Sequence, residues 1–250
     1  MMTKLGSLSA RTASGQFVPH GPRFVNLQGE PSRRGFTIAG AIAIFHTMAI
    51  LKIARMGHPV LTRRADEIDD PFAPEIRRLL ADMLDTLADA DGTGLAAPQV
   101  HTAKRLVLFR IGGGRAGDEP GDDTVPLTVL FNPVVEPLGD EMEPGWEACL
   151  SLPGMMGEVP RYTQIRYSGL DINGENLTRM ASGFHARVVQ HECDHLDGIL
   201  YPIRMTDISR FGFADEMRAL ARAEAADKAR TAQEDGTEQE DEEINETADV

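Results

Sequence analysis

The order of the hydrophobic segments predicts an α+β fold, in which antiparallel strands pack around a central helix that carries an HExxH motif. A helical stripe comes first, strands and a hairpin signal follow, and a second helical segment comes after them. This order lacks the strand–helix–strand alternation that is typical of parallel sheets. We therefore expect the strands to pair in an antiparallel manner.

The first expected element is a helix that begins near Pro74. From Glu75 onward, the apolar residues recur at the spacing of a single helical stripe, namely at Ile76, Leu79, Leu80, Met83, Leu84 and Leu87. Pro74 suits a first helical turn, and Gly92 follows the end of the stripe. Packing against a core explains this helix without any further role.

Three strands and a tight turn are expected next. Residues 106–109 (LVLF) and 127–131 (LTVLF) are apolar runs of strand length on either side of a loop rich in Gly and Asp. Residues 163–171 alternate between apolar and polar side chains, and the pair Asn173-Gly174 follows them. This dipeptide is a strong hairpin signal, so we expect a further strand after it.

Two helices close the pattern. Residues 184–197 have helical periodicity, and Gly198 is suited to the position after a helix end. Residues 213–232 are rich in Ala and predict a C-terminal helix. Residues 233–250 are expected to be an acidic, disordered tail.

The N-terminal segment, residues 1–47, is expected to lie outside the main domain, residues 48–212. It is rich in Gly, Ser, Pro and Arg and has no sustained periodicity, as in a segment without a core to join. We interpret it as upstream sequence from a misplaced start, with Met48 as the genuine start. The alternatives are a genuine disordered extension or an export signal, since two arginines precede an apolar run at residues 37–51.

Composition narrows the class of protein. The formal net charge is −14, but residues 231–250 hold nine acidic residues and no Lys or Arg, so the remainder carries −14 + 9 = −5. This balance argues against nucleic-acid recognition. The apolar run near the N-terminus is shorter than the roughly 20 residues of a membrane span. Two cysteines form no disulfide framework and suit a reducing cytoplasm.

The most informative segment is HECDH at residues 191–195. On a helix, residues i and i+4 lie about 40° apart around the axis, so both imidazoles point in one direction. They can bind one metal ion, with Glu192 as a base for its water. The alternative is two unrelated histidines beside a surface glutamate. Phe184 and Val188 share the helix face, so we expect the histidines to face inward.

Three candidates exist for the ligand that joins His191 and His195. The extended HExxHxxGxxH pattern requires a third histidine where this chain has Tyr201. A zinc endopeptidase of the thermolysin type uses a glutamate on a later helix, and Glu216 lies at a suitable spacing. Cys149, as a thiolate, gives a Cys/His/His site with one open position, which is typical of catalytic metal sites.

Three segments together resemble the signature motifs of the peptide deformylase family, in the same order: GTGLAAPQ at 92–99, EACLS at 147–151 and QHECDH at 190–195. The resemblance covers residues 48–212, and the segment after Met48 also looks like a start of that family. It favours Cys149 over Glu216 as the third ligand.

The resemblance implies hydrolysis of the formyl group on the N-terminal methionine of newly made polypeptides, with release of formate. It implies one divalent metal ion, Fe²⁺ by family resemblance, with Zn²⁺ as the alternative. Formyl-methionyl N-termini of nascent chains are the expected partners, with the ribosome as a further one, in the cytoplasm and without a membrane. By analogy, Glu192 moves the proton, while the Gln99 amide and the Leu150 backbone N–H stabilise the oxyanion.

The same resemblance suggests where a peptide binds. Gly94 lacks a side chain where an extended peptide would approach and pair with the backbone. The methionine side chain is expected in an apolar pocket formed by Leu95, Phe184 and Val188, with Ala148 beside the cleft.

Two residues depart from the family pattern. Ala148 stands where members usually have glycine, and its methyl group could crowd the peptide. Met156 stands where many members have an arginine, so a guanidinium that could orient Glu147 or the cleft is expected to be missing. These departures keep an alternative open, namely a protein that binds formylated peptides with little turnover.

Two neighbours of the histidines have structural interpretations. Cys193 lies two residues after His191, about 200° around the helix, so we expect a buried core cysteine that faces away from the metal. Asp194 is expected to pair with Arg161 and brace the helix.

Overall fold

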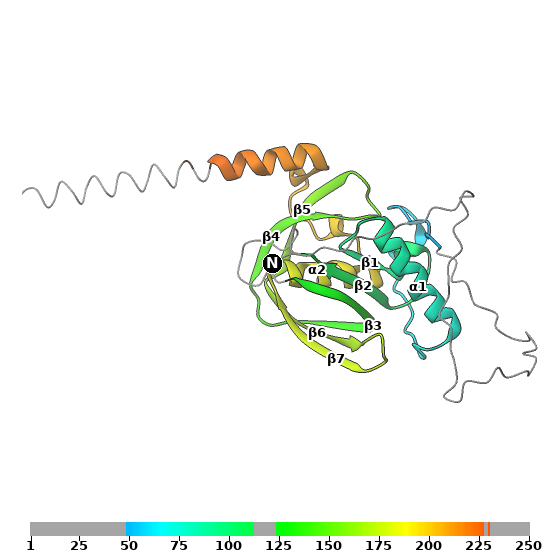
Figure 1. Ribbon diagram of the computed structural model, residues 1–250. Coiled ribbons are helices and arrows are strands. Elements are labelled where there is room, and N and C mark those ends of the chain that lie inside the picture. The colour runs from blue at the N-terminus through cyan, green and yellow to red at the C-terminus, as the bar shows by residue number, and fades with distance from the viewer. Residues whose placement is uncertain (1–48, 113–123, 228–229, 231–250) are drawn as a thin grey trace, which may run out of the picture. The chain divides into compact units, whose positions relative to one another are not determined.

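The computed structural model describes residues 49–112, 124–227 and 230 (Figure 1). The helices and strands are α1 (Pro74–Asp89), β1 (Gly94–Ala96), β2 (Leu106–Ile111), β3 (Val125–Pro137), β4 (Met142–Ala148), β5 (Met155–Tyr162), β6 (Gln164–Leu170), β7 (Asn176–Ser182), α2 (Gly183–Leu196) and β8 (Phe211–Phe213). Short 3₁₀ helices are η1 (Pro59–Thr62), η2 (Ala97–Val100), η3 (Tyr201–Ile203) and η4 (Ile208–Arg210).

Residues 214–227 are helical, within the range expected for a C-terminal helix. The interpretations of residues 1–47 and of the acidic tail, 233–250, fall on residues outside the described part of the chain. Within the described residues, no helix combines the length and apolar character needed to cross a membrane.

The strands form two antiparallel sheets. The five-stranded sheet has the order β1-β2-β3-β6-β7, and the three-stranded sheet has the order β4-β5-β8. All pairings between the named strands are antiparallel, as expected from the sequence. The fold is therefore a mixed α/β fold with antiparallel sheets.

Strand β2 shows why the larger sheet carries helices on both faces. Leu106 and Leu108 pack in a cluster with the apolar stripe of α1, whereas Val107 and Phe109 pack in a cluster with α2. Successive side chains of a strand point to opposite faces, so a continuous apolar run suits a strand covered on both sides. Burial of each such large side chain contributes roughly 1.5–3 kcal/mol to folding.

The expected helix stripe and hairpin are present. The α1 residues Ile76, Leu80 and Met83 are buried in one core cluster. The turn between β6 and β7 contains Gly174 with φ +75°, the left-handed conformation that the Asn-Gly signal predicts. Gly198, just after α2, has the same φ of +75°.

Helix α2 contacts both sheets of the domain. It contacts β1, β2, β3, β6 and β7 of the larger sheet and β5 of the smaller one (Figure 1). Residues 186 and 188–196 of α2 are all buried, including its polar side chains. A helix whose polar residues are buried between two sheets is a place where a chemical site can be built.

Candidate metal centre

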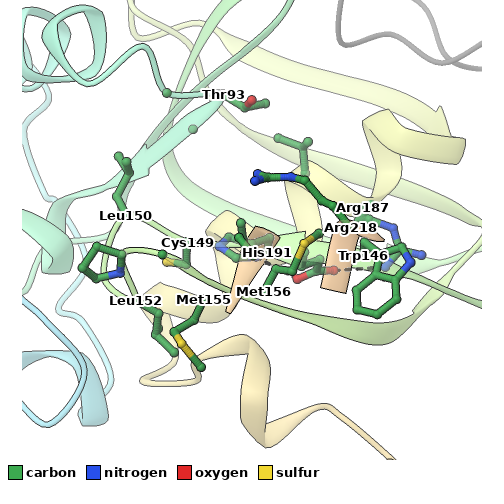
Figure 2. A pocket seen from close by; sticks show the side chains of 18 of the residues that line it. Thr93, Trp146, Cys149, Leu150, Leu152, Met155, Met156, Arg187, His191 and Arg218 are labelled. Atoms are coloured by element: carbon green, nitrogen blue, oxygen red, sulfur yellow. Dashed lines mark hydrogen bonds and ion pairs between the residues drawn. The ribbon is translucent and has the colours of Figure 1, made fainter. Parts of the chain in front are cut away.

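Two elements bring three possible metal ligands together. His191 and His195 lie on α2, one turn apart, and Cys149 follows the end of β4. The ligand atoms of these three buried residues all lie within 4.8 Å of one another, and Cys149 Sγ is 3.3 Å from His195 Nε2 (Figure 2). Among the described residues this is the one group of three or more His, Cys, Asp or Glu side chains at such spacing.

The two cysteines have opposite environments, as the helical phase predicts. Burial opposes ionisation of Cys149, but the charges and hydrogen bonds of His195 and His191 outweigh it and hold the pKa of the thiol well below its ordinary value. Cys193 is buried in the core cluster between α2 and the larger sheet, where burial raises its pKa. Only Cys149 is therefore prepared to bind a cation as a thiolate.

Glu147 fixes the orientation of one imidazole. His191 Nδ1 lies 2.8 Å from Glu147 Oε2, and a carboxylate only accepts, so Nδ1 carries the proton and Nε2 is free to bind a metal. Burial would raise the pKa of Glu147, but its hydrogen bonds with His191 and Arg161 hold that pKa well below the ordinary value. A carboxylate behind a ligating histidine is a common support of metal sites.

A buried charge network extends behind this carboxylate. Arg161 donates from Nε and Nη2 to the two oxygens of Glu147, at 2.8 and 3.0 Å, and from Nη1 to Asp194 Oδ2 at 2.5 Å. Arg204 donates to both oxygens of Asp194, at 2.7 and 3.2 Å. The expected pair of Asp194 with Arg161 is present. It connects β5 to α2 directly behind the histidines.

The expectation that Glu147 lacks an orienting guanidinium is wrong. Arg161 and Arg187 both donate to this carboxylate, although Met156 replaces the arginine that many family members carry. The reason is topological, because Arg161 lies on β5, which pairs with β4, and the side chain of Arg187 extends from α2 to Glu147. Met156 is buried in the cavity wall instead.

Arg187 was not singled out in the sequence, yet it joins α2 to both strands of the β4–β5 hairpin. Its guanidinium donates to Glu147 Oε1 at 3.1 Å and to the backbone carbonyls of Val159, Glu143 and Gly145 at 2.6, 2.9 and 3.3 Å. A Cβ atom at Gly145 would lie 2.6 Å from Arg187 Nη2. Glycine at this position therefore makes room for the guanidinium.

Replacing Gly145 by alanine should force the Arg187 guanidinium out of place. Because a buried, charged hydrogen-bond cluster is then broken, we expect the free energy of unfolding to fall by about 2–4 kcal/mol. In an Arg187→Ala background, the same Gly145→Ala change should cost less than about 1 kcal/mol. Urea unfolding of the four proteins measures this double-mutant cycle.

Gly112→Ala is the matched control, because a Cβ atom there would meet nothing within 4 Å. It should change the free energy of unfolding by less than about 0.5 kcal/mol. Equal costs of Gly145→Ala with and without Arg187 would show that the glycine serves some other purpose.

Glu192 lies beside the ligand group and is almost fully buried. Its Oε2 has no hydrogen-bond partner among the described residues, and burial raises its pKa to about 7. A carboxyl group with a pKa near neutrality can both take up and return a proton. Gly94 packs directly against it, because a Cβ atom there would lie 2.1 Å from Glu192 Oε1. The glycine thus makes room for the carboxylate, in addition to lining the cavity.

The Gln99 side-chain amide makes three hydrogen bonds that fix its orientation. Its Oε1 accepts from the Ala96 backbone N–H at 2.8 Å, so the amide NH₂ points the other way. That nitrogen lies 3.3 Å from both Cys149 Sγ and Ser151 Oγ. The donor therefore faces the candidate metal ligands, and Leu150 lies next to Cys149 in the same cavity wall.

One cavity of about 800 Å³ is lined by Gln99, Cys149, His191 and Glu192, among other residues. Cys149 and His191 lie near its middle, with Leu150 toward one end and Trp146 and Arg218 toward the other (Figure 2). The volume and the mostly apolar walls suit part of a peptide. The cavity contains most of the expected substrate residues, namely Gly94, Ala148, Phe184 and Val188.

The expectation that Leu95 lines this cavity is wrong, whereas the choice of Cys149 over Glu216 agrees with the ligand group. Leu95 does not line it, since its side chain is fully buried in the core cluster with α1. The alternation of β1 explains this, because Gly94 faces Glu192 and the next side chain points to the other face. Glu216 does line the cavity, from the C-terminal helix, but it does not belong to the group of possible metal ligands.

A thiol and two imidazoles beside a buried carboxylate, in a peptide-sized cavity, are features of the metallohydrolase class.

Comparisons with known proteins place the chain in a family of such hydrolases. The family model described as polypeptide deformylase matches residues 50–211. Peptide deformylase 1 of Nitrosomonas europaea is 49% identical over 168 residues, which are 67% of this chain and 94% of that protein. Peptide deformylase 1 of Bordetella pertussis is 53% identical over 163 residues, or 65% and 92% of the two chains.

Solved structures show the same similarity. A class I type b peptide deformylase from Acinetobacter baumannii, bound to Met-Ala-Ser, is 32% identical with a TM-score of 0.58 and covers 63% of this chain and 99% of that chain. The peptide deformylase from Ehrlichia chaffeensis gives a TM-score of 0.58 at 27% identity, with 70% and 97% coverage. This chain belongs to the polypeptide deformylase family and is a hydrolase of that family.

Proposed function

We propose that this protein removes the N-formyl group from the N-terminal methionine of newly made polypeptides and releases formate. The observation that carries the proposal is the buried Cys149, His191 and His195 group, with Glu192 beside it, inside the matched family region. The similar structure that contains Met-Ala-Ser supports a methionyl peptide in the corresponding cavity.

The donor set fits one divalent metal ion. A thiolate and two imidazoles suit Zn²⁺ or Fe²⁺, and the family resemblance favours Fe²⁺. Cys149, His191 and His195 would be the ligands, on α2 and at the end of β4. When bound, the metal lowers the pKa of a water and polarises the formyl oxygen. Glu192, whose buried Oε2 has no hydrogen-bond partner among the described residues, would accept a proton from such a water.

The side chains of this protein would do the remaining work. Glu192 takes the proton of the attacking water, as negative charge develops on the formyl oxygen. The Gln99 amide and the Leu150 backbone N–H would donate hydrogen bonds to that oxygen, and one such donor contributes about 10²–10³ in rate. Glu192 then returns the proton to the leaving amine, so formate and a free N-terminus are released.

The peptide would lie along the cavity. Gly94 and Ala148 offer backbone on two sides, and Phe184 and Val188 of α2 offer an apolar surface to the methionine side chain. The substrate class also suggests where the protein acts. Nascent chains carry the formyl group in the cytoplasm, so we place the activity there, close to the ribosome as a partner.

The decisive test is formate release from formyl-Met-Ala-Ser under anaerobic conditions, with metal analysis of the same sample. One formate per cleaved peptide is expected, and the acetylated peptide should give no product. Tight peptide binding without formate would favour a binding protein with little turnover. Cleavage of an internal peptide bond instead would favour the endopeptidase alternative that uses Glu216.

Ala148 and Met156 are directly opposite each other in the β4–β5 ladder, and both line the cavity. Ala148→Gly should raise kcat/KM on formyl-methionyl peptides about tenfold if the methyl group crowds the peptide, which corresponds to about 1.4 kcal/mol. Met156→Arg should add little through Glu147, because Arg161 and Arg187 already engage that carboxylate. The double variant shows whether these neighbours are coupled.

Deletion of residues 231–250 is the control, and it should leave kcat/KM unchanged. A parent protein as fast as its relatives, with no gain from Ala148→Gly, would show that alanine is tolerated at this position.

A further inference from the structure

A second cavity, of about 710 Å³, lies next to the catalytic one. It is formed by the segment before η1 and by the residue that follows η2, and its lining includes Lys52, Arg55, His58 and His101. Leu150 and Pro153 line both cavities. The backbone connects them as well, because Ala54 N donates to Gln99 O at 2.7 Å.

The second cavity is lined by basic side chains, although the chain as a whole is acidic. Its lining contains four basic side chains and no carboxylate, although Asp and Glu outnumber Lys and Arg by 39 to 25 in the sequence. Within the part of the chain that the structure describes, none of the four basic residues makes an ion pair. An unneutralised basic cavity attracts small anions.

Two of the basic residues, the exposed His58 and His101, contact each other, and a backbone contact sets the tautomer of His58. The rings of His58 and His101 meet edge to face, with centroids 4.6 Å apart. His58 Nδ1 accepts from Val60 N at 3.2 Å, so the ring proton of the neutral form is on Nε2. His101 follows η2 with φ +65°, a left-handed conformation that is uncommon for non-glycine residues.

The position of the cavity argues against a peptide as its occupant. In the proposed mechanism, the Leu150 backbone N–H donates to the formyl oxygen, so the peptide would extend from there along the catalytic cavity, whose other end is lined by Trp146 and Arg218 (Figure 2). The formyl group is the terminal group of the substrate, so no part of the peptide lies beyond Leu150. What is released at that end is an anion, formate.

We propose that the cavity lined by Lys52, Arg55, His58 and His101 is a small-oxyanion site that receives formate as it leaves the catalytic cavity. This inference rests on the proposed function for the source of the formate. The ligand chemistry is a single carboxylate, bound by two fixed positive charges and two imidazole N–H groups. Drawing the anionic product away from the metal ligands would limit its return.

The test is a titration of the full-length, Zn²⁺-loaded protein with sodium formate at constant ionic strength, observed through the histidine ring signals in NMR spectra. The formate range extends to about 50 mM, because a ligand of three heavy atoms binds no more tightly than about millimolar. The signals of His58 and His101 should shift saturably. His185, which lies against Tyr167 Oη at 3.2 Å, should not respond.

Variants then test the charge requirement. Lys52→Gln combined with Arg55→Gln should raise the dissociation constant of formate at least about fivefold, since both fixed charges are removed. Arg78→Gln combined with Lys104→Gln changes the net charge equally outside the cavity and should have no such effect. The titration needs no turnover, so it succeeds or fails independently of the formate-release assay.

Three results would overturn the proposal. Shifts of only His191 and His195 would place formate on the metal alone. Shifts with inorganic phosphate but not with formate would assign the cavity to a different anion. A short RNA that moves the signals of His58 and His101, when formate does not, would assign it to nucleic-acid phosphate.

Discussion

Replacing Glu192 by glutamine is expected to lower kcat by about 10²- to 10⁴-fold, because glutamine cannot accept the proton of the attacking water. The change is nearly isosteric, and Glu192 is not one of the three possible metal ligands, so the metal content should equal that of the parent protein. KM should change little, since the carboxylate acts on the water and on the leaving amine. Formate release and metal analysis on one sample measure both quantities.

Glu136→Gln is the matched control for this change. Glu136 lies on β3 in an exposed ion pair with Arg166 at 2.8 Å, so its replacement should leave kcat unaltered. If a metal-replete Glu192→Gln sample kept a tenth or more of the parent kcat, another group would have to move the proton, and the assignment of Glu192 would be wrong.

The part of the site that could be predicted from the sequence is the part that is local in the chain. His191, Glu192 and His195 lie within one helical turn, and the 3.6-residue period alone places both imidazoles on one face. The same period correctly placed Cys193 in the core. Cys149 lies 42 residues before His191, and no local period connects the two. Its selection over Glu216 therefore depended on family resemblance.

The strands of the smaller sheet, and the short strand β1 of the larger one, were not predicted from the sequence. Strand β4 has Pro144 and Gly145 in its middle, and only Glu147 among its residues is buried, so it shows neither alternation nor an apolar run. Strand β2, by contrast, is covered by helices on both faces and has an apolar run that is easily recognised. Strands are predicted well where burial leaves a pattern.

The hydrogen bonds that hold Glu147 behind His191 were also not predicted, because they join residues that are far apart in the chain. Arg187 looks like an ordinary surface cation in the sequence, and Arg161 was expected to pair with Asp194, yet both also donate to Glu147 from different elements. Only the pairing of β4 with β5 and the packing of α2 against β5 bring these side chains to Glu147. One sequence signal was available, namely Gly145 within a strand, which often marks a close approach of another group.

Replacing Cys149 by alanine is expected to release most of the bound metal, whereas replacing Cys193 by alanine should leave the metal content intact. The first change removes one of three protein ligands, and two imidazoles alone hold a divalent ion weakly. The second removes a buried thiol from the core cluster beside Val189, so it should lower the free energy of unfolding by about 1–2 kcal/mol. Metal analysis after gel filtration and urea unfolding separate the two effects.

The pair of cysteine variants is its own control, because the same atoms are deleted at two buried sites 44 residues apart in the chain. A Co²⁺-loaded sample adds a spectroscopic measurement, since the thiolate-to-metal absorption band should disappear in Cys149→Ala and persist in Cys193→Ala. Equal metal loss in both variants would contradict the ligand assignment. It would also contradict the helical phase that turns Cys193 away from the histidines, and with it the geometry on which the proposed mechanism depends.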